Sequence, residues 1–164
     1  MNIRRLQGLF LILSGVCVLV GFLGSNGTFF IAIALAGVIL FILGILAIPL
    51  EQPMGWLGWV GIVLVELAAV IALGFQVGLL NGTALILTSA ICGTLGRLVV
   101  GWLTTRGKVF SAWVGWAFIL EGLLNLIGGV FHLGSLAGVV SIFTTLVGAA
   151  ALFGYGFIIF RKKA

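Results

Sequence analysis

The sequence predicts an all-α integral membrane protein with six transmembrane helices. Of its 164 residues 63% are apolar and only 7% are charged, a balance far from that of soluble globular proteins. The apolar residues form continuous runs of roughly 20 residues, the length that a helix needs to cross the hydrocarbon core of a bilayer. Because these runs do not alternate apolar and polar residues, they favour helices over the strands of a membrane barrel.

Short breaks rich in polar residues or glycine divide the chain into six apolar segments. The segments cover residues 6–23, 29–48, 56–76, 84–103, 110–131 and 136–160. The first follows Arg4 and Arg5 as a signal peptide would, but no small-residue cleavage pattern follows it, so we interpret it as an uncleaved helix. Since the segments take up nearly the whole chain, we expect residues 1–164 to form a single membrane domain.

The basic residues outside the apolar core predict the orientation of the chain. They are Arg4, Arg5, Arg106, Lys108, Arg161, Lys162 and Lys163. Six spans place all of them on one side, whereas the turns at 24–28, 77–83 and 132–135 lack lysine and arginine. The positive-inside rule then predicts a cytoplasmic membrane protein with both termini in the cytoplasm. Basic residues confined to the chain ends and one loop do not form a nucleic-acid-binding face. The expected partners are the lipid bilayer and, within it, a homo-oligomer or a larger membrane complex.

Several features recur at a spacing of 55 residues. Asn26 and Asn81 lie in similar turns, and Glu66 and Glu121 lie in similar apolar segments. A Trp-x-Gly-Trp motif also lies near the start of both the third and the fifth segment, at Trp56 and at Trp113, a spacing of 57 residues. A fixed period predicts repeated units, here three parallel two-helix hairpins. Their approximate limits are 1–53, 54–108 and 109–164. Chance similarity between apolar segments is the alternative explanation.

Three ionisable residues, Glu66, Arg97 and Glu121, lie within the predicted spans. At about 1.5 Å per residue, both glutamates fall near the bilayer midplane. An ionisable group there costs at least ~2.5–3.5 kcal/mol, so each should have a partner. We expect Arg97 to form a salt bridge with one glutamate, while the other is protonated or shares a proton. The pair would either hold hairpins in register or belong to a proton or solute path.

Asn125 and His132 extend this polar group, because they follow Glu121 at i+4 and i+11 on one helical face. The resulting stripe would run from the midplane to the outer surface. Histidine titrates near the pH of acid stress, so His132 is a candidate sensor of external acidification. A solvated histidine at the end of a helix is the alternative.

The sequence offers no recognisable enzyme chemistry. It has no Gly-x-Ser-x-Gly motif, no phosphate-binding loop and no cluster of metal-ligating residues. Cys17 and Cys92 lie in separate apolar segments without the spacing of a redox or metal motif. We therefore expect a non-enzymatic protein without a metal or a cofactor.

The run from Gly93 to Lys108, followed by Trp113 and an apolar helix with an acidic residue, resembles the HdeD-like family of small acid-resistance membrane proteins. The shared features are an arginine after a glycine-rich helical turn, a basic loop and a tryptophan-led helix. The first hairpin departs from the pattern, because it has no tryptophan or carboxylate at the matching places. The resemblance implies a hairpin-built membrane protein linked to envelope or acid stress. The alternatives are a small transporter or proton conduit, and a scaffold or accessory subunit of a larger membrane complex.

Overall fold

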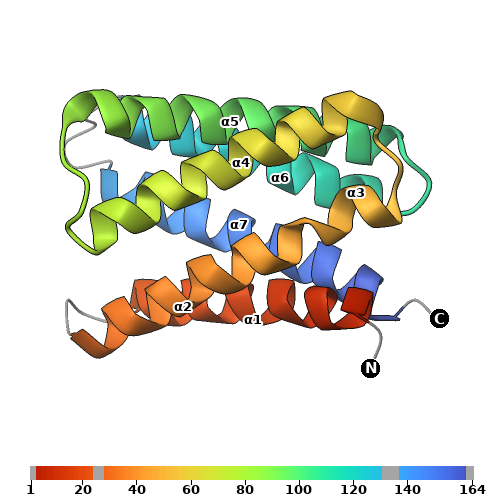
Figure 1. The fold of residues 1–164 in the computed structure, drawn as a ribbon, viewed down its shortest axis with the longest axis horizontal. Coiled ribbons are helices and arrows are strands. Elements are labelled where there is room, and N and C mark those ends of the chain that lie inside the picture. Colours follow the sequence, from red (N-terminus) through yellow and green to blue (C-terminus); the bar gives the residue numbers. More distant parts are fainter. Residues whose placement is uncertain (1–2, 24–27, 131–136, 162–164) are drawn as a thin grey trace.

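The computed structural model describes residues 3–23, 28–130 and 137–161, and within them all regular secondary structure is helical. The helices are α1 (Ile3–Leu23), α2 (Thr28–Ile45), α3 (Ala47–Glu51), α4 (Gly55–Gln76), α5 (Thr83–Arg106), α6 (Ala112–Val130) and α7 (Ala137–Arg161) (Figure 1). The prediction of an all-α fold is confirmed.

Five helical stretches are long and apolar enough to cross a membrane. They are α1, α4, α5, α7 and the stretch Phe29–Glu51, which joins α2 and α3. In α6 the apolar part, Ala112–Gly128, is shorter. The chain is therefore a multi-pass helical membrane protein, whereas the count of six spans and the threefold repeat stay predictions.

The second predicted segment, 29–48, is interrupted near its end. Helix α2 ends at Ile45, Leu46 forms a turn, and the short helix α3 follows. Pro49 explains the break, because it has no N–H to donate to the Ile45 carbonyl and its ring crowds that same carbonyl group. Two interactions connect the end of α3 to other helices. Glu51 forms an ion pair with Arg4 of α1 at 3.4 Å. Gln52 Nε2 donates a hydrogen bond to the Leu103 carbonyl of α5 at 2.8 Å.

The six long helices form a closed ring in the order α1, α2, α4, α5, α6, α7, with α7 packed against α1. Neighbours in the ring pack along much of their lengths, except that α2 and α4 touch at far fewer positions. We call this α2–α4 junction the seam. The start of α1, the end of α7 and the short helix α3 lie at one end of the bundle, and the loop between α4 and α5 lies at the other (Figure 1). We call the two halves of the bundle the terminal half and the distal half.

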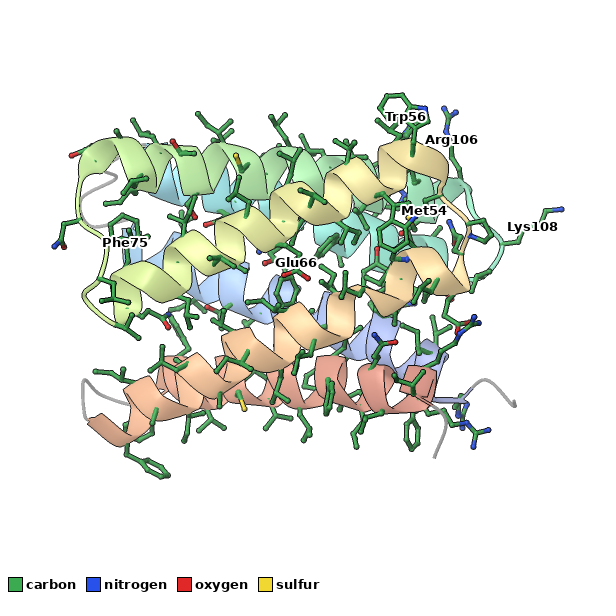
Figure 2. All side chains as sticks on the ribbon, in the orientation of Figure 1. Met54, Trp56, Glu66, Phe75, Arg106 and Lys108 are labelled. Carbon is green, nitrogen blue, oxygen red and sulfur yellow. The ribbon has the colours of Figure 1, made fainter. Side chains whose placement is uncertain are left out.

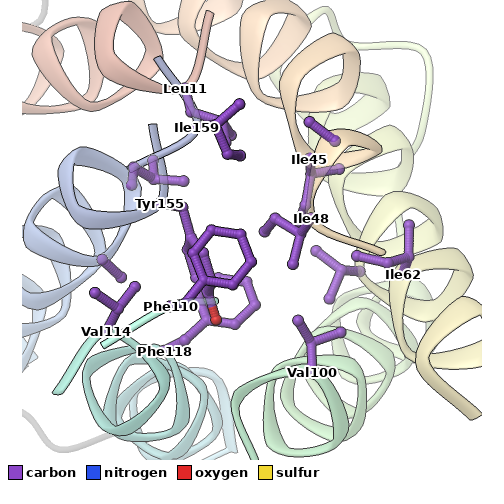
Figure 3. Packing of buried hydrophobic residues seen from close by; sticks show 14 of the residues in the cluster. Leu11, Ile45, Ile48, Ile62, Val100, Phe110, Val114, Phe118, Tyr155 and Ile159 are labelled. Carbon is purple, nitrogen blue, oxygen red and sulfur yellow. The ribbon is translucent and has the colours of Figure 1, made fainter. Parts of the chain in front are cut away.

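Aromatic side chains fill the middle of the terminal half (Figure 3). The ring of Tyr155 is fully buried and meets Phe110 and Phe118 edge to face, with centroids 5.0 and 5.5 Å away. Its hydroxyl shares a 2.8 Å hydrogen bond with the Thr104 hydroxyl, so the one polar atom of this side chain has a partner. Aliphatic side chains from the surrounding helices complete the core, including Leu11, Ile45, Ile48, Ile62, Val100, Val114 and Ile159. The interior is therefore closed on this side.

Glycines allow neighbouring helices to touch through their backbones, as at the α5–α6 and α7–α1 crossings. A Cβ added at Gly101 of α5 would lie 2.7 Å from the Gly115 carbonyl oxygen of α6. A Cβ added at Gly156 of α7 would lie 2.6 Å from the Gly8 carbonyl oxygen of α1. Real Cβ atoms essentially never come within 3.0 Å of such an atom, so only glycine allows the two helices to lie this close together. Glycines serve the same purpose at the close helix crossings of other membrane proteins.

Tryptophan side chains mark the terminal ends of α4, α5 and α6. Trp56, Trp59, Trp102, Trp113 and Trp116 are all exposed, and Trp56 reaches 77% exposure. Figure 2 shows Trp56 and Arg106 at this end of the bundle, and the guanidinium carbon of Arg106 lies 4.1 Å from the ring centroid of Trp102. Exposed tryptophans at helix ends are typical of the membrane–water interface, which supports a bundle that spans the bilayer along its long axis.

Candidate functional site

The distal half of the bundle contains a chamber of about 590 Å³ that is not fully enclosed. All six long helices contribute to its wall. It extends from Arg97 and Glu121, in the middle of the bundle, towards Phe75 and Ile86 near the distal ends of α4 and α5. Its polar lining consists of Ser14, Ser89, Arg97, Glu121, Asn125, Thr144 and Thr145. The remaining lining is apolar and is rich in alanine on α4.

An ion pair lies at the floor of the chamber. Arg97 Nη2 and Glu121 Oε1 are 3.0 Å apart, and both side chains are only 14% exposed. Arg97 Nη1 also donates to the Gly93 carbonyl at 3.2 Å, and its guanidinium carbon lies 5.7 Å from the ring centroid of Phe118. Phe118 belongs to the core of the terminal half. The pair therefore stands where the packed core ends and the chamber begins.

Glycines on both sides make room for this pair. A Cβ at Gly148 of α7 would lie 3.0 Å from the carboxyl carbon of Glu121. A Cβ at Gly122 would lie 3.0 Å from the Cβ of Arg97. These glycines form part of the site that sequence reasoning missed, because nothing in a single sequence tells which glycine faces a charged side chain.

Asn125 joins the ion pair in the lining of the chamber, one helical turn beyond Glu121 in the distal direction. Three hydroxyl groups of the lining have partners within the bundle. The hydroxyls of Ser14, Ser89 and Thr144 donate to the carbonyls of Gly37, Ala68 and Val140. Asn125 and the carboxylate of Glu121 are polar groups at the floor that can bind a molecule inside the chamber.

Glu66 lies apart from the other three residues of the predicted polar group. It is half-buried and does not line the chamber, and Figure 2 shows its side chain between α4 and α2. Its Oε1 atom is buried and has no hydrogen-bond partner among the residues that the structure describes. The geometry of α4 explains why Glu66 lies there. Val65 and Ala68 face the glycines of α5. Glu66 is rotated by about 100° around the helix axis from Val65, so it faces α2 instead. The expected constellation of four residues is thus divided between the chamber and the seam.

Two further expectations concern pH sensing and metal binding. His132 lies outside the described residues, so its role as a sensor stays a prediction. Within the described ranges, no group of three or more histidine, cysteine, aspartate or glutamate residues could hold a metal ion. Cys17 and Cys92 are free thiols on different helices, α1 and α5.

Comparison of the chain with protein-family models, with curated proteins and with solved structures found no match. The resemblance to the HdeD-like family therefore rests on the sequence features between Gly93 and Trp113 and on the hairpin pattern.

Proposed function

We propose that this chain is a non-enzymatic, multi-pass protein of the cytoplasmic membrane that binds a small amphipathic molecule in its chamber. The observation that carries the proposal is the chamber itself, with apolar walls and a buried ion pair at one end. Small-molecule sites usually have volumes of about 300–1,000 Å³, apolar linings and a few polar groups that fix the orientation of the ligand. A volume of about 590 Å³ falls inside that range.

The chemistry of the floor favours an uncharged head group that both donates and accepts hydrogen bonds. Glu121 contacts Arg97 through Oε1, which leaves its second carboxylate oxygen as an acceptor. Asn125 supplies an amide that can donate as well as accept. A charged head group would have to compete with a 3.0 Å ion pair in a low-dielectric site, whereas a hydroxyl group can bind beside the intact pair.

The walls favour an apolar chain on that head group. Val38 and Phe41 of α2 and Ala69 and Ala72 of α4 present only carbon to the chamber. Contacts with such walls stabilise a hydrocarbon chain through dispersion. A long-chain alcohol has both required parts and is a suitable probe.

The proposed cellular role rests on the resemblance to the HdeD-like family, and the proposed orientation in the membrane rests on the distribution of basic residues. The HdeD-like pattern supports a role in the envelope or acid-stress response. Basic residues at the terminal end, such as Arg4, Arg106 and Arg161, support an orientation with both chain ends in the cytoplasm. The chamber would then lie in the outer half of the membrane.

Photolabelling tests whether the chamber binds such a molecule. Proteoliposomes containing the full chain are incubated with a hexadecanol that carries a diazirine group, irradiated, and analysed by peptide mass spectrometry. We expect saturable labelling of chamber residues that Ala72→Trp, which fills the chamber, reduces at least tenfold. Val63→Trp is the matched control, because Val63 lies on the same helix but is 62% exposed on its outer face. Labelling that does not saturate, or that falls equally in both variants, would contradict the proposal.

A proton conduit is the second candidate, because the Arg97–Glu121 pair borders the chamber in the middle of the bundle. It is supported less well, since a continuous path would have to pass the aromatic core around Tyr155. Glu121→Gln should abolish a pH-driven flux into proteoliposomes if the protein conducts protons. The absence of flux in the wild-type protein would rule out this candidate.

A further inference from the structure

The three junctions between the predicted hairpins are not alike. At α5–α6 and at α7–α1, a glycine of each helix meets the backbone of the other, at Gly101 with Gly115 and at Gly156 with Gly8. The third junction is the seam between α2 and α4, where the helices touch at few positions. The glycines of α2 contact α1, and those of α4 contact α5 or residues close in sequence. The seam therefore has no backbone contact of the kind that closes the other two junctions.

The chamber reaches this loosely packed junction. Val38 and Phe41 on one side of the seam and Ala69 and Ala72 on the other all belong to the lining. In Figure 1, α2 and α4 cross the face of the bundle turned to the viewer, and no other described helix covers them there. At the seam, therefore, only α2 and α4 separate the chamber from the outside of the bundle, and the side chains that α4 contributes there are small.

Glu66 places an unused polar group at the same junction. On α4 it lies between Ile62, which belongs to the core, and Ala69, which lines the chamber. These residues share one helical face at i−4 and i+3, so Glu66 stands at the edge of the chamber wall. Its buried Oε1 lacks a hydrogen-bond partner within the described part of the chain. A carboxyl group near the bilayer midplane without a partner is expensive, and such residues commonly mark the path of a substrate.

We infer that the amphipathic molecule reaches the chamber sideways from the bilayer through the α2–α4 seam, and that the Glu66 carboxyl binds its head group on the way. The inference rests on the proposed function, because it names the route and the chemical class of the same ligand. That class is a membrane-dissolved molecule with one apolar chain and an uncharged hydroxyl-type head group. At the end of the route the head group leaves Glu66 for Glu121 and Asn125, while the chain remains between the walls of the seam.

The rate and the position of photolabelling test this route. The probe is hexadecanol with the diazirine at the terminal carbon, added to proteoliposomes and irradiated at successive times. We expect Glu66→Leu to slow labelling about tenfold, the effect of losing one hydrogen bond during access, without changing its final extent. Glu66→Gln, which keeps hydrogen-bonding atoms, should label at close to the wild-type rate. Val63→Leu is the control on the outer face of α4 and should label as fast as the wild type.

The position of the label in the wild-type protein gives a second measurement that does not depend on the folding of any variant. A chain that lies in the seam should place the label on Val38, Ala69 or Ala72. Saturable labelling on Val18 and Ile86 instead, or equal rates for wild type and Glu66→Leu, overturns the lateral route and leaves the proposed function standing. The absence of saturable labelling in every form of the protein overturns the proposed function itself.

Discussion

The two halves of the bundle are built from the same helices, yet one is filled and the other is hollow. In the terminal half, α4 presents Ile62 and Val65 to the interior, and α7 presents Tyr155 and Ile159. In the distal half, α4 presents alanines and α7 presents Thr144 and Thr145. From Ile62 to Ala72 on α4, and from Tyr155 to Thr144 on α7, the inward-facing side chains thus become smaller towards the distal half. The comparison teaches that a chamber can arise from a gradient of side-chain volume, without a change in the helical backbone.

The ionisable residues within the bundle lie at the boundary between the halves. Counted along their helices at about 1.5 Å per residue, Glu66, Arg97 and Glu121 are about 14–17 Å from the terminal ends. At this level the aromatic core provides a floor of low dielectric, and the chamber provides space above it. A charge placed one turn nearer the termini would be enclosed by the core, which is the costlier position.

The largest effect is expected where the halves meet. Arg97→Leu leaves the Glu121 carboxylate buried without its 3.0 Å partner, so we expect it to destabilise the protein by about 3–5 kcal/mol. Arg97→Leu combined with Glu121→Leu should be more stable than either single variant, because no uncompensated charge remains. Unfolding in detergent micelles monitored by circular dichroism measures both effects. If the double variant is no more stable than the less stable single variant, the loss of the ion pair does not explain the destabilisation of the single variants.

An intermediate effect is expected from removing an aromatic ring in the filled half. Phe118 is fully buried, so Phe118→Ala leaves a void on the order of 100 Å³ and costs about 2 kcal/mol at ~24 cal/mol per Å³. The cost contains only this loss of packing. It contains no transfer of the side chain from water, because the helices remain in an apolar medium when the protein unfolds. Phe75→Ala in the hollow half should cost less than about 1 kcal/mol, because Phe75 is half-buried and already borders empty space. Equal losses in the same unfolding assay would remove the distinction between the halves.

The smallest effect is expected from adding volume to the hollow half. Ala72→Leu projects into the chamber, so its stability should stay within roughly 0.5 kcal/mol of the wild type. Ala151→Leu makes the same chemical change at a fully buried position of the core and should cost about 1–3 kcal/mol through overpacking. Thermal unfolding of the two variants side by side gives the comparison. If Ala72→Leu is as harmful as Ala151→Leu, the chamber is filled by other side chains in the folded protein.

Part of the site could be predicted from sequence because it depends on single residues. An arginine and two glutamates in apolar segments indicate an ion pair in the membrane, whatever the packing of the helices. The Asn125 stripe also follows from helical spacing alone. The chamber could not be predicted, because its volume depends on which alanines, threonines and glycines of six helices face one another. The break after Ile45 had a local signal in Pro49, but the predicted segment 29–48 ran through it.

The sequence by itself determined the class of the protein, the approximate limits of its long helices and the positions of its charged residues along them. These properties follow from apolar length, turn residues and rise per residue, which are local. Only the tertiary structure decided that Arg97 binds Glu121 and that Glu66 faces the seam. The two glutamates lie in similar apolar segments, and the difference between their contacts comes from the rotation of each helix against its neighbours. That rotation is set by contacts between residues far apart in sequence, such as Gly96 of α5 against Val65 of α4.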